Sequence, residues 1–321
     1  MVPSFVYYVI PTVLVLIGIR KCRERKWGAC NNKVKLSRKV VIVTGASSGI
    51  GFEIAKDLAM REAQVIMACR NLDEAAKAIC KIKRELNCSS VIVPMELDLA
   101  SIRSVTNFAD EIKSTYSEVH LLINNAGVAY PDGVKQRTKD GFEIHIGTNH
   151  LGHFLLTNLL LETLLKAESS RVVIVTSTLH ERGKLHLDDL NLEKVAKTDP
   201  YANSKLANVY FCKELARRTQ NTGLTVYAAC PGWVYTNLFR HFKRKWYQNL
   251  LILPIAFLFM RSSKQGAQTP IYCATEPSLG KESGGIYKDC KKYVSKMIFD
   301  TNLSERLWEI SKKMIYEIDG N

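Results

Sequence analysis

From residue 39 onward, short runs of β-branched and aliphatic residues alternate with longer amphipathic stretches. This alternation is typical of βαβ units, in which helices connect parallel strands. The expected strands are 40–44, 64–69, 91–96, 121–124, 172–177, 225–229 and 285–288, and the expected helices are 50–62, 73–86, 102–116, 142–166, 202–218 and 264–275. The sequence therefore predicts a doubly wound (Rossmann) α/β domain with a parallel sheet of about seven strands, helices on both faces, and ligands bound beyond the carboxyl ends of the strands.

The first residues of the chain differ from this pattern. Val2 to Ile19 contain no charged residue, which is near the roughly 18 residues that a spanning helix needs, although Pro3 and Pro11 interrupt the run. Basic residues follow the run instead of preceding it, and no small-residue cleavage site comes after it. An uncleaved N-terminal membrane anchor is therefore expected in place of a secretory signal.

The net charge of +14 comes from 45 basic against 31 acidic residues, in a chain that is 46% hydrophobic and so neither disordered nor many times membrane-spanning. Nine Lys and Arg residues lie between Arg20 and Lys39, where Glu24 is the one acidic residue. Basic residues after an anchor favour a cytosolic location for the rest of the chain. A nucleic-acid-binding protein is the alternative, but no nucleic-acid motif accompanies the charge. Nine cysteines without a C-x-x-C pattern fit a reducing compartment, and palmitoylation of Cys22 or Cys30 stays open.

The first expected strand runs directly into a glycine-rich segment, Thr44-Gly45-Ala46-Ser47-Ser48-Gly49-Ile50-Gly51, and then into a helix. Glycines permit a tight turn and a close approach of the backbone to a pyrophosphate, while the helix amides add partial positive charge. Glycines with this spacing also occur in ordinary turns. Their position after the first strand is what favours a dinucleotide site.

Arg70 ends the second expected strand, where sites for NAD place an acidic residue that binds the ribose 2′-hydroxyl. A guanidinium suits a 2′-phosphate instead, so Arg70 predicts NADP(H) as the cofactor. Asp73 and Glu74 lie too far along the chain to take the acidic role. The alternative is that Arg70 is a solvated surface arginine.

Tyr201 and Lys205 lie four residues apart at the start of an expected helix and so share one face. A phenol titrates near pH ~10, and a nearby ammonium stabilises the phenolate, so the pair suits a general acid or base. Such pairs are also common on solvated helices. The pair by itself does not identify an active site.

Together these motifs resemble the short-chain dehydrogenase/reductase family. The matching positions are Thr44–Gly51, Asn124-Asn125-Ala126-Gly127, Asn149, Ser177, Tyr201 with Lys205, and Pro231-Gly232, in the family's order and spacing. The resemblance covers roughly residues 38 to 310. Within the family the chain looks like the membrane-bound retinol dehydrogenase group, with 148–154 and 264–269 as supporting stretches.

The resemblance implies a catalytic set of Asn149, Ser177, Tyr201 and Lys205. Tyr201 would be the general acid in reduction, Ser177 would hydrogen-bond the substrate oxygen, Lys205 would lower the tyrosine pKa and bind the nicotinamide ribose, and Asn149 would hold a proton-relaying water. The implied cofactor contacts are Gly45, Ser47, Ser48, Gly49, Ile50, Gly51, Arg70, Asn71, Asp98, Leu99, Asn125, Ala126, Gly127, Tyr201, Lys205, Pro231, Gly232, Val234 and Thr236. No metal is expected, and His150, His153 and His180 are expected to pack or to contact substrate.

The expected layout is a transmembrane anchor at 1–20, a basic linker at 21–37, and a dehydrogenase domain at 38–321 with a substrate lid at 233–262. Within the lid, the apolar stretch 246–260 comes after the basic residues Arg240 and 243–245, and it suits either a second membrane contact or a cover on the substrate pocket.

The expected function is an NADP(H)-dependent oxidoreductase acting on CH–OH donors, which interconverts a lipophilic alcohol and its aldehyde or ketone. Retinol and retinal are the leading pair by resemblance, and fatty, isoprenoid and sterol carbonyls stay open. The expected location is a membrane, that of the endoplasmic reticulum, with the domain facing the cytosol; an oligomer is open. The alternative from another class is a catalytically silent Rossmann scaffold tethered to a membrane, against which the intact Ser177, Tyr201 and Lys205 argue.

Overall fold

The computed structural model describes residues 6–86, 90–131, 133–195, 197–236, 238 and 246–319. Its centre is an eight-stranded sheet in the order β3-β2-β1-β4-β5-β6-β7-β8. The strands are β1 (Val40–Thr44), β2 (Gln64–Cys69), β3 (Ile92–Glu96), β4 (Leu121–Asn124), β5 (Ser170–Val175), β6 (Leu224–Cys230), β7 (Gly285–Lys288) and β8 (Lys291–Lys292). Strands β1 to β7 pair in parallel, and the short β8 pairs antiparallel with β7. The predicted parallel sheet is confirmed, with β8 as an addition.

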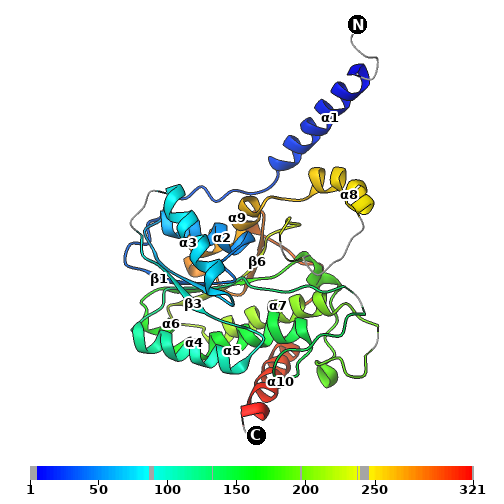
Figure 1. The fold of residues 1–321 in the computed structure, drawn as a ribbon. Helices are drawn as coiled ribbons and strands as arrows, with labels where there is room; N and C mark the ends of the chain where they lie inside the picture. The colour runs from blue at the N-terminus through cyan, green and yellow to red at the C-terminus, as the bar shows by residue number, and fades with distance from the viewer. Residues whose placement is uncertain are drawn as a thin grey trace.

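Helices cover both faces of the sheet (Figure 1). They are α1 (Val6–Glu24), α2 (Gly49–Met60), α3 (Leu72–Leu86), α4 (Ile102–Thr115), α5 (Gly152–Leu159), α6 (Leu161–Lys166), α7 (Pro200–Arg218), α8 (Trp246–Phe259), α9 (Ser263–Thr275) and α10 (Thr301–Asp319), with shorter turns η1 (Ile146–Leu151), η2 (Thr178–Arg182), η3 (Leu187–Asp189) and η5 (Pro277–Lys281). One core lies under α2, α3 and α9, and the other lies under α4, α5, α7 and α10. Val41 and Val43 of β1 enter the first core, while Val40 and Ile42 enter the second, because successive strand residues point to opposite faces.

The stretch 142–166, expected as one helix, is divided in the structure. It begins as the π-helix η1, continues as α5 and restarts as α6, because Leu160 has φ −94° and ψ 1° and leaves the helical conformation. Helix α10, which follows the last strand, was not predicted. It packs Trp308 against Phe154 of α5, with ring centres 4.8 Å apart, and against Phe211 of α7.

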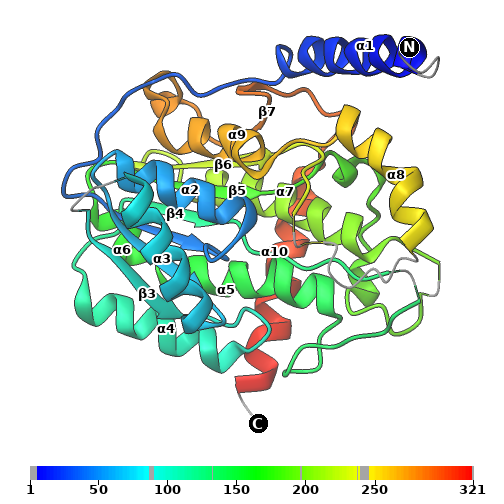
Figure 2. The ribbon, with the colours of Figure 1, turned by 45° about the horizontal axis from the view of Figure 1, so that its top comes forward.

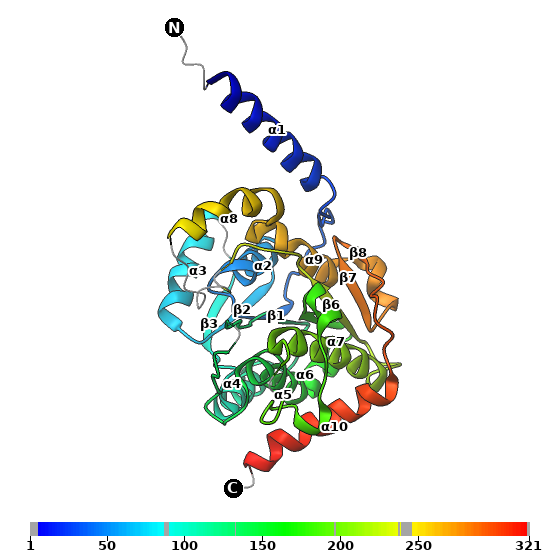
Figure 3. The same cartoon turned by 90° about the vertical axis from the view of Figure 1, so that its right-hand side faces the viewer.

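Helix α1 projects away from the domain, as Figure 1 and Figure 3 show from two sides. Helix α8 contacts it, since Arg20 Nη1 of α1 donates a hydrogen bond to the Phe257 carbonyl at 2.6 Å. Figure 2 shows α8 at the rim of the domain, beyond the end of α9. Apart from its first residues, the run 2–19 forms part of α1. Of the helices that the structure describes, none combines the length and apolar content that crossing a membrane requires.

Candidate active site

A cleft of about 1140 Å³ opens at the carboxyl ends of strands β1 to β6. Its lining includes residues at or just after the end of each of these strands, at 44–45, 47–51, 68–71, 97–99, 125–130, 175–179 and 231–234. The strand order reverses between β1 and β4, and doubly wound sheets bind ligands at such a reversal. Every residue expected to contact the cofactor lines this one cleft, as do Ser177, Tyr201 and Lys205. Asn149 does not line it and is buried behind its wall.

The turn after β1 has the conformation that its glycines suggested. Gly45 and Gly49 have φ of 65° and 61°, in the left-handed region that glycine adopts without steric cost. A side chain at Gly51 would lie 2.3 Å from the Gly45 carbonyl oxygen and 2.6 Å from Asn125 Nδ2. Glycine at these positions therefore lets α2 begin close to the strand ends, with its first residues lining the cleft.

Thr44, at the end of β1, hydrogen-bonds to the segment after the neighbouring strand β4. Its Oγ1 accepts hydrogen bonds from the backbone N–H groups of Asn125 and Ala126, both at 2.9 Å. Asn125 Nδ2 in turn donates to the Thr44 carbonyl at 2.8 Å. Thr44 lies in the glycine-rich motif, but nothing in the pattern indicated that it holds the segment after β4 in place.

Arg70 lies at an exposed end of the cleft, after β2. Asn71 Oδ1 accepts a hydrogen bond from the Glu74 N–H at 3.0 Å, and α3 begins beside it. Glu74, which was expected to lie too far along the chain to take the acidic role on the ribose, also lines the cleft. A guanidinium and a carboxylate therefore share this end of the site. Asp98, after β3, forms an ion pair with Lys139 at 3.0 Å.

Helix α7 brings Tyr201 and Lys205 into the cleft one turn apart. Asp199 caps the helix, since its Oδ1 accepts a hydrogen bond from the Ala202 N–H at 2.9 Å. Lys205 Nζ donates to the Val175 carbonyl at 3.1 Å and lies 5.7 Å from the Tyr201 ring centre. Burial, with the charge of Asp199, raises the pKa of Tyr201, and burial lowers the pKa of Lys205 to about 8. In this structure burial outweighs the neighbouring ammonium, and the expected lowering of the Tyr201 pKa by Lys205 stays a prediction.

Ser177 comes after β5, between Thr176 and Thr178, and lines the cleft. Its Oγ accepts a hydrogen bond from the Leu179 N–H at 3.2 Å and keeps its own proton for another partner. Thr176 instead is buried and donates from Oγ1 to the Lys205 carbonyl at 2.8 Å, which braces α7 against β5. This contrast favours Ser177 over Thr176 as the substrate contact.

Asn149 lies in the π-helix η1, a rare widened turn that is frequent at functional sites. Its Oδ1 accepts from the Val128 N–H at 2.8 Å, and its Nδ2 donates to the Val128 carbonyl at 3.1 Å and to Ser204 Oγ at 3.0 Å. Ser204, which sequence reasoning missed, donates to the Tyr201 carbonyl at 2.7 Å. Asn149 therefore connects the cleft wall to the helix that carries Tyr201. That it also holds a relay water stays a prediction.

The segment after β6 lies against the glycine-rich turn. A side chain at Gly49 would lie 3.4 Å from Thr236 Cγ2. Gly232, with φ 84°, leaves space for Arg261, whose guanidinium carbon would lie 2.7 Å from a side chain placed there. Arg261 donates to the Pro231 carbonyl at 3.2 Å and forms an ion pair with Asp289. The basic residues Arg240 and 243–245 lie outside the described residues.

His150, His153 and His180 form contacts within the protein. Buried His150 contacts Ser311 of α10 through Nε2 at 2.9 Å, and buried His153 contacts Thr44 Oγ1 at 2.9 Å. Burial lowers their pKa values to about 4 and about 3, so both rings are neutral at physiological pH. His180 contacts Ser295 Oγ at 2.9 Å. Within the described part of the chain, no group of three or more His, Cys, Asp or Glu residues is placed to hold a metal ion.

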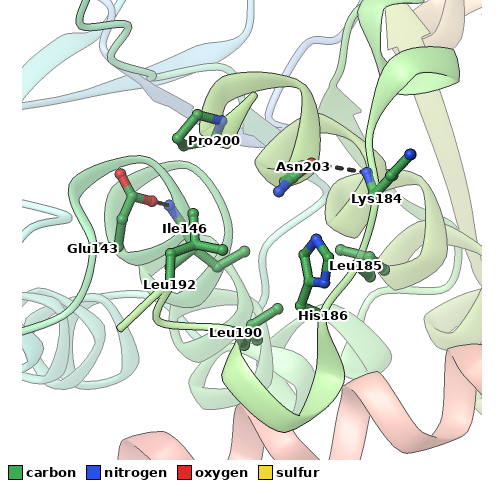
Figure 4. Close-up of a pocket in the computed structure, with 9 residues that line it drawn as sticks. All are labelled: Glu143, Ile146, Lys184, Leu185, His186, Leu190, Leu192, Pro200 and Asn203. Carbon is green, nitrogen blue, oxygen red and sulfur yellow. Dashed lines mark hydrogen bonds between the residues drawn. The ribbon is translucent and has the colours of Figure 1, made fainter. Parts of the chain in front are cut away.

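A second cavity of about 10 Å³ lies near Pro200, between Glu143, Ile146 and the segment 184–192 (Figure 4). This volume is about that of one water molecule. No substrate fits there, so the large cleft is the candidate site.

The large cleft fits a nicotinamide dinucleotide. Its glycines leave space where side chains would intrude: one at Gly127 would lie 3.2 Å from Asn149 Oδ1 and 3.6 Å from Lys205 Nζ. The start of α2 offers unpaired backbone N–H groups to a pyrophosphate. Arg70 and Lys205 provide positive charge toward the two ends of the dinucleotide, which carries several negative charges.

Comparison with known proteins agrees with this geometry. Residues 39–246 match the short chain dehydrogenase family. Retinol dehydrogenase 11 of Mus musculus is 41% identical to this chain over 305 residues, which are 94% of each protein. Retinol dehydrogenase 12 of Homo sapiens is 41% identical over 316 residues, which are 97% of this chain and 95% of that protein.

Solved structures share the fold. An uncharacterized protein from Mycobacterium paratuberculosis superposes with a TM-score of 0.69 at 32% identity and covers 90% of this chain and 97% of its own. A short chain dehydrogenase from Shigella flexneri, complexed with NADP, has a TM-score of 0.64 at 22% identity and covers 81% of this chain and 100% of its own. The second likeness shows the fold alone.

The chain therefore belongs to the short-chain dehydrogenase family, whose members are oxidoreductases that use NAD(H) or NADP(H). Its similarity to the two retinol dehydrogenases over nearly its whole length places it in the retinol dehydrogenase-like group. It is accordingly an oxidoreductase of alcohols and carbonyl compounds.

Proposed function

We propose that this chain is an NADP(H)-dependent oxidoreductase that interconverts a lipophilic alcohol and its aldehyde or ketone. The observation that carries the proposal is a single cleft lined by Ser177, Tyr201 and Lys205 and also by Arg70. Arg70 comes after β2 and Ser177 after β5, three strand positions apart in the sheet. That separation is about 14 Å at the usual strand spacing, which suits an extended dinucleotide that joins the two groups.

In reduction, Tyr201 donates a proton to the substrate oxygen. Burial raises its pKa, so the phenol is protonated at neutral pH and serves as a general acid. Ser177 donates a hydrogen bond to the same oxygen as negative charge develops there. Lys205 is cationic below its pKa of about 8, and at 5.7 Å from the Tyr201 ring it stabilises the phenolate that remains. In oxidation the same groups act in the opposite sense.

The bound dinucleotide supplies or accepts the hydride. The residues at 45–51 bind its pyrophosphate, and Lys205 donates a hydrogen bond to the nicotinamide ribose. Asp98 and Leu99 flank the adenine, Asn125 and Gly127 the adenosine ribose, and Val234 with Thr236 the nicotinamide amide and pyrophosphate. Arg70 forms a charge-assisted pair with the 2′-phosphate, as a guanidinium does with phosphate oxygens.

The substrate is lipophilic, and retinal or retinol leads the candidates because both curated relatives are named retinol dehydrogenases. Apolar surface lies where such a molecule would enter. Trp233 lines the cleft with half of its surface exposed, and Tyr235 beside it is three-quarters exposed. Fatty, isoprenoid and sterol carbonyls use the same chemistry and are tested alongside.

We also propose a membrane location, with residues 1–20 as the anchor, 21–37 as the basic linker and 38–321 as a cytosolic domain on the endoplasmic reticulum. Large apolar residues are exposed on both contacting helices, among them Leu14 of α1 (62% exposed) and Leu253 of α8 (58%). An exposed apolar surface of this kind marks a membrane or partner contact. Lys21 and Arg25 beside it suit anionic headgroups. The substrate lid at 233–262, through α8, is then a second contact beside the cleft.

A substrate panel tests the enzymatic proposal. The full chain in detergent micelles is given retinal, a long-chain fatty aldehyde, an isoprenoid aldehyde or a sterol ketone, with NADPH or NADH, and absorbance of the reduced nicotinamide is followed. We expect turnover with at least one aldehyde, faster with NADPH. NADPH binding without turnover on any substrate would instead favour a catalytically silent scaffold.

A further inference from the structure

Two side chains, four residues apart in sequence, hold the wall of the cleft beside Tyr201. The wall is the segment 126–130, all of which lines the cleft. Asn149 bonds both the N–H and the carbonyl of Val128. His145, one turn earlier, accepts the Tyr130 N–H on its Nε2 at 2.9 Å. The first contact involves an expected catalytic residue, whereas no sequence motif pointed to His145.

The Tyr130 contact determines the protonation of His145. A backbone N–H only donates, so Nε2 must carry a lone pair, and the ring proton of the neutral imidazole resides on Nδ1. Nδ1 lies 2.6 Å from Glu143 Oε1, which accepts that proton's hydrogen bond. Glu143 thereby fixes both the tautomer and the ring orientation, as a carboxylate does for a histidine metal ligand.

Glu143 is itself well held. Its carboxylate accepts hydrogen bonds from the backbone N–H of His145 at 3.0 Å and of Ile146 at 2.9 Å, and Figure 4 shows it turned toward the Ile146 amide. Burial alone would raise the pKa of Glu143, but the His145 side chain and these amides together lower it, so the carboxylate is ionised. The His145 ring is therefore held by hydrogen bonds at both of its nitrogens.

The His145 ring also contacts the reacting tyrosine. It stands edge-on to Tyr201 with ring centres 6.4 Å apart and an interplanar angle of 81°, and edge-on to Tyr130 at 6.0 Å. Such edge-to-face contacts favour one relative orientation of two rings. His145 is buried and does not line the cleft, so it reaches the substrate only through these neighbours.

We propose that His145, oriented by Glu143, is a positioning residue that sets the distance between the wall at Tyr130 and the proton donor Tyr201, and thereby the fit of the substrate carbonyl. The proposal rests on the proposed function for its kinetic consequence. Its structural consequence, the anchoring of the Tyr130 N–H, stands independently.

Two conservative variants separate the two bonds of His145. Gln places an oxygen near the position of Nε2 and retains an acceptor for Tyr130, whereas Asn places its amide near Nδ1, within reach of Glu143, and is too short to reach Tyr130. His145→Ala removes both. We expect the KM for the aldehyde to rise roughly tenfold in His145→Ala and His145→Asn, with most of the loss recovered in His145→Gln.

Hydrogen–deuterium exchange supplies a second measurement that needs no substrate. In the full chain, exchange at 126–131 should accelerate roughly tenfold in His145→Asn and stay near wild type in His145→Gln, because a lost hydrogen bond exposes the Tyr130 amide. His150→Gln is the control for loss of a buried histidine, since His150 contacts α10 instead of the wall. It should lower thermal stability without changing exchange at 126–131 or the KM.

Equal KM values and equal exchange rates in the Gln and Asn variants would overturn the proposal. If His145→Ala does not fold, the comparison of Gln with Asn still decides. If wild type shows no turnover, the proposed function fails, and the exchange measurement alone tests the anchoring. Faster exchange in Asn without a change in KM would refute the link to substrate fit.

Discussion

In the cofactor cleft, polar side chains bond to buried groups of the protein, whereas on α1 and α8 large apolar side chains face outward. Lys205 is held by the Val175 carbonyl, and Asn149 by Val128 and Ser204. Across the other region, Leu14 and Leu253 are more than half exposed. The first arrangement fixes geometry to fractions of an ångström, which proton transfer needs. The second leaves apolar surface for a lipid or a lipophilic substrate.

One aromatic residue connects the two regions. Trp27, just after α1, has the Arg20 guanidinium 4.6 Å from its ring centre and the Arg261 guanidinium 5.0 Å from it. Arg261 in turn donates to the Pro231 carbonyl in the cleft wall. Cation–π contacts of this kind are each worth about 0.5–2 kcal/mol. The comparison therefore predicts large effects for changes within the cleft and small, graded effects for changes at the connection.

Tyr201→Phe should have the largest effect. Removal of the hydroxyl deletes the transferable proton without deleting the ring that packs on His145. Turnover should fall by about two to four orders of magnitude, while NADPH affinity and melting temperature change little. Tyr210→Phe is the matched control, because Tyr210 is buried on the same helix and does not line the cleft. Near-normal turnover of Tyr201→Phe in steady-state assays would contradict the assignment.

Substitution of Arg70 should have the second-largest effect, on the choice between NADPH and NADH. Arg70→Asp reverses the charge that the proposal pairs with the 2′-phosphate, so the Kd for NADPH should rise roughly tenfold to a hundredfold, with NADH binding unchanged or tighter. Glu74→Gln is the matched variant at the same end of the cleft, and it should tighten NADPH binding by a few-fold. Fluorescence titration with both cofactors measures each Kd. Equal weakening of NADPH and NADH by Arg70→Asp would make Arg70 a structural residue.

The two regions also differ in how far the sequence predicts them. The alternation of strands and helices predicted the parallel sheet. Every residue expected from the motifs to contact the cofactor lines one cleft. Both features depend on local conformation and on which strand a residue follows, and the sequence shows these directly. Glu74 lines the same end of the cleft as Arg70, which its distance along the chain did not indicate.

Long-range contacts account for most of what was missed. Ser204, Arg261 and His145 act through partners that lie far from them in the chain, so no periodic pattern identifies them. The spacing of Tyr201 and Lys205 shows the neighbouring ammonium but not the burial that raises the pKa of the phenol. Helix α10 was also missed. It lies after the alternating strands and helices, and its Trp308 and Ile315 pack in the second core against distant parts of the chain.

The pH dependence of reduction should show the state of Lys205. Because burial lowers its pKa to about 8, the ammonium is present below that pH and is lost above it. The kcat/KM for NADPH, which reports groups of the free enzyme, should fall as pH rises through about 8, by up to about tenfold per pH unit. Lys205→Met should have a low rate without this descending limb. The same limb in Lys205→Met would assign the titration to another group.

The smallest effect is expected where the two regions meet. Arg20 donates to the carbonyls of Phe257 and Met260 at the end of α8, at 2.6 and 2.5 Å, and pairs with Glu24 at 2.7 Å. Cations at a helix C-terminus stabilise it by about 0.3–1 kcal/mol, so Arg20→Gln should loosen α8 without unfolding the domain. Hydrogen exchange in 253–260 should accelerate several-fold.

The same variant should change the KM for a long-chain aldehyde in vesicles by about two- to threefold and leave the Kd for NADPH unchanged. Helix α8 follows the cleft-lining residues 231–234 and 236 in the chain, but none of its side chains that the structure describes lines the cleft. Lys21→Gln is the matched control: it removes the same charge from the next residue of α1, whose side chain is exposed. If the two variants weaken aldehyde use equally, the effect comes from net charge at the membrane. If only Arg20→Gln does so, the contact between α1 and α8 transmits the position of the N-terminal helix to the substrate entrance.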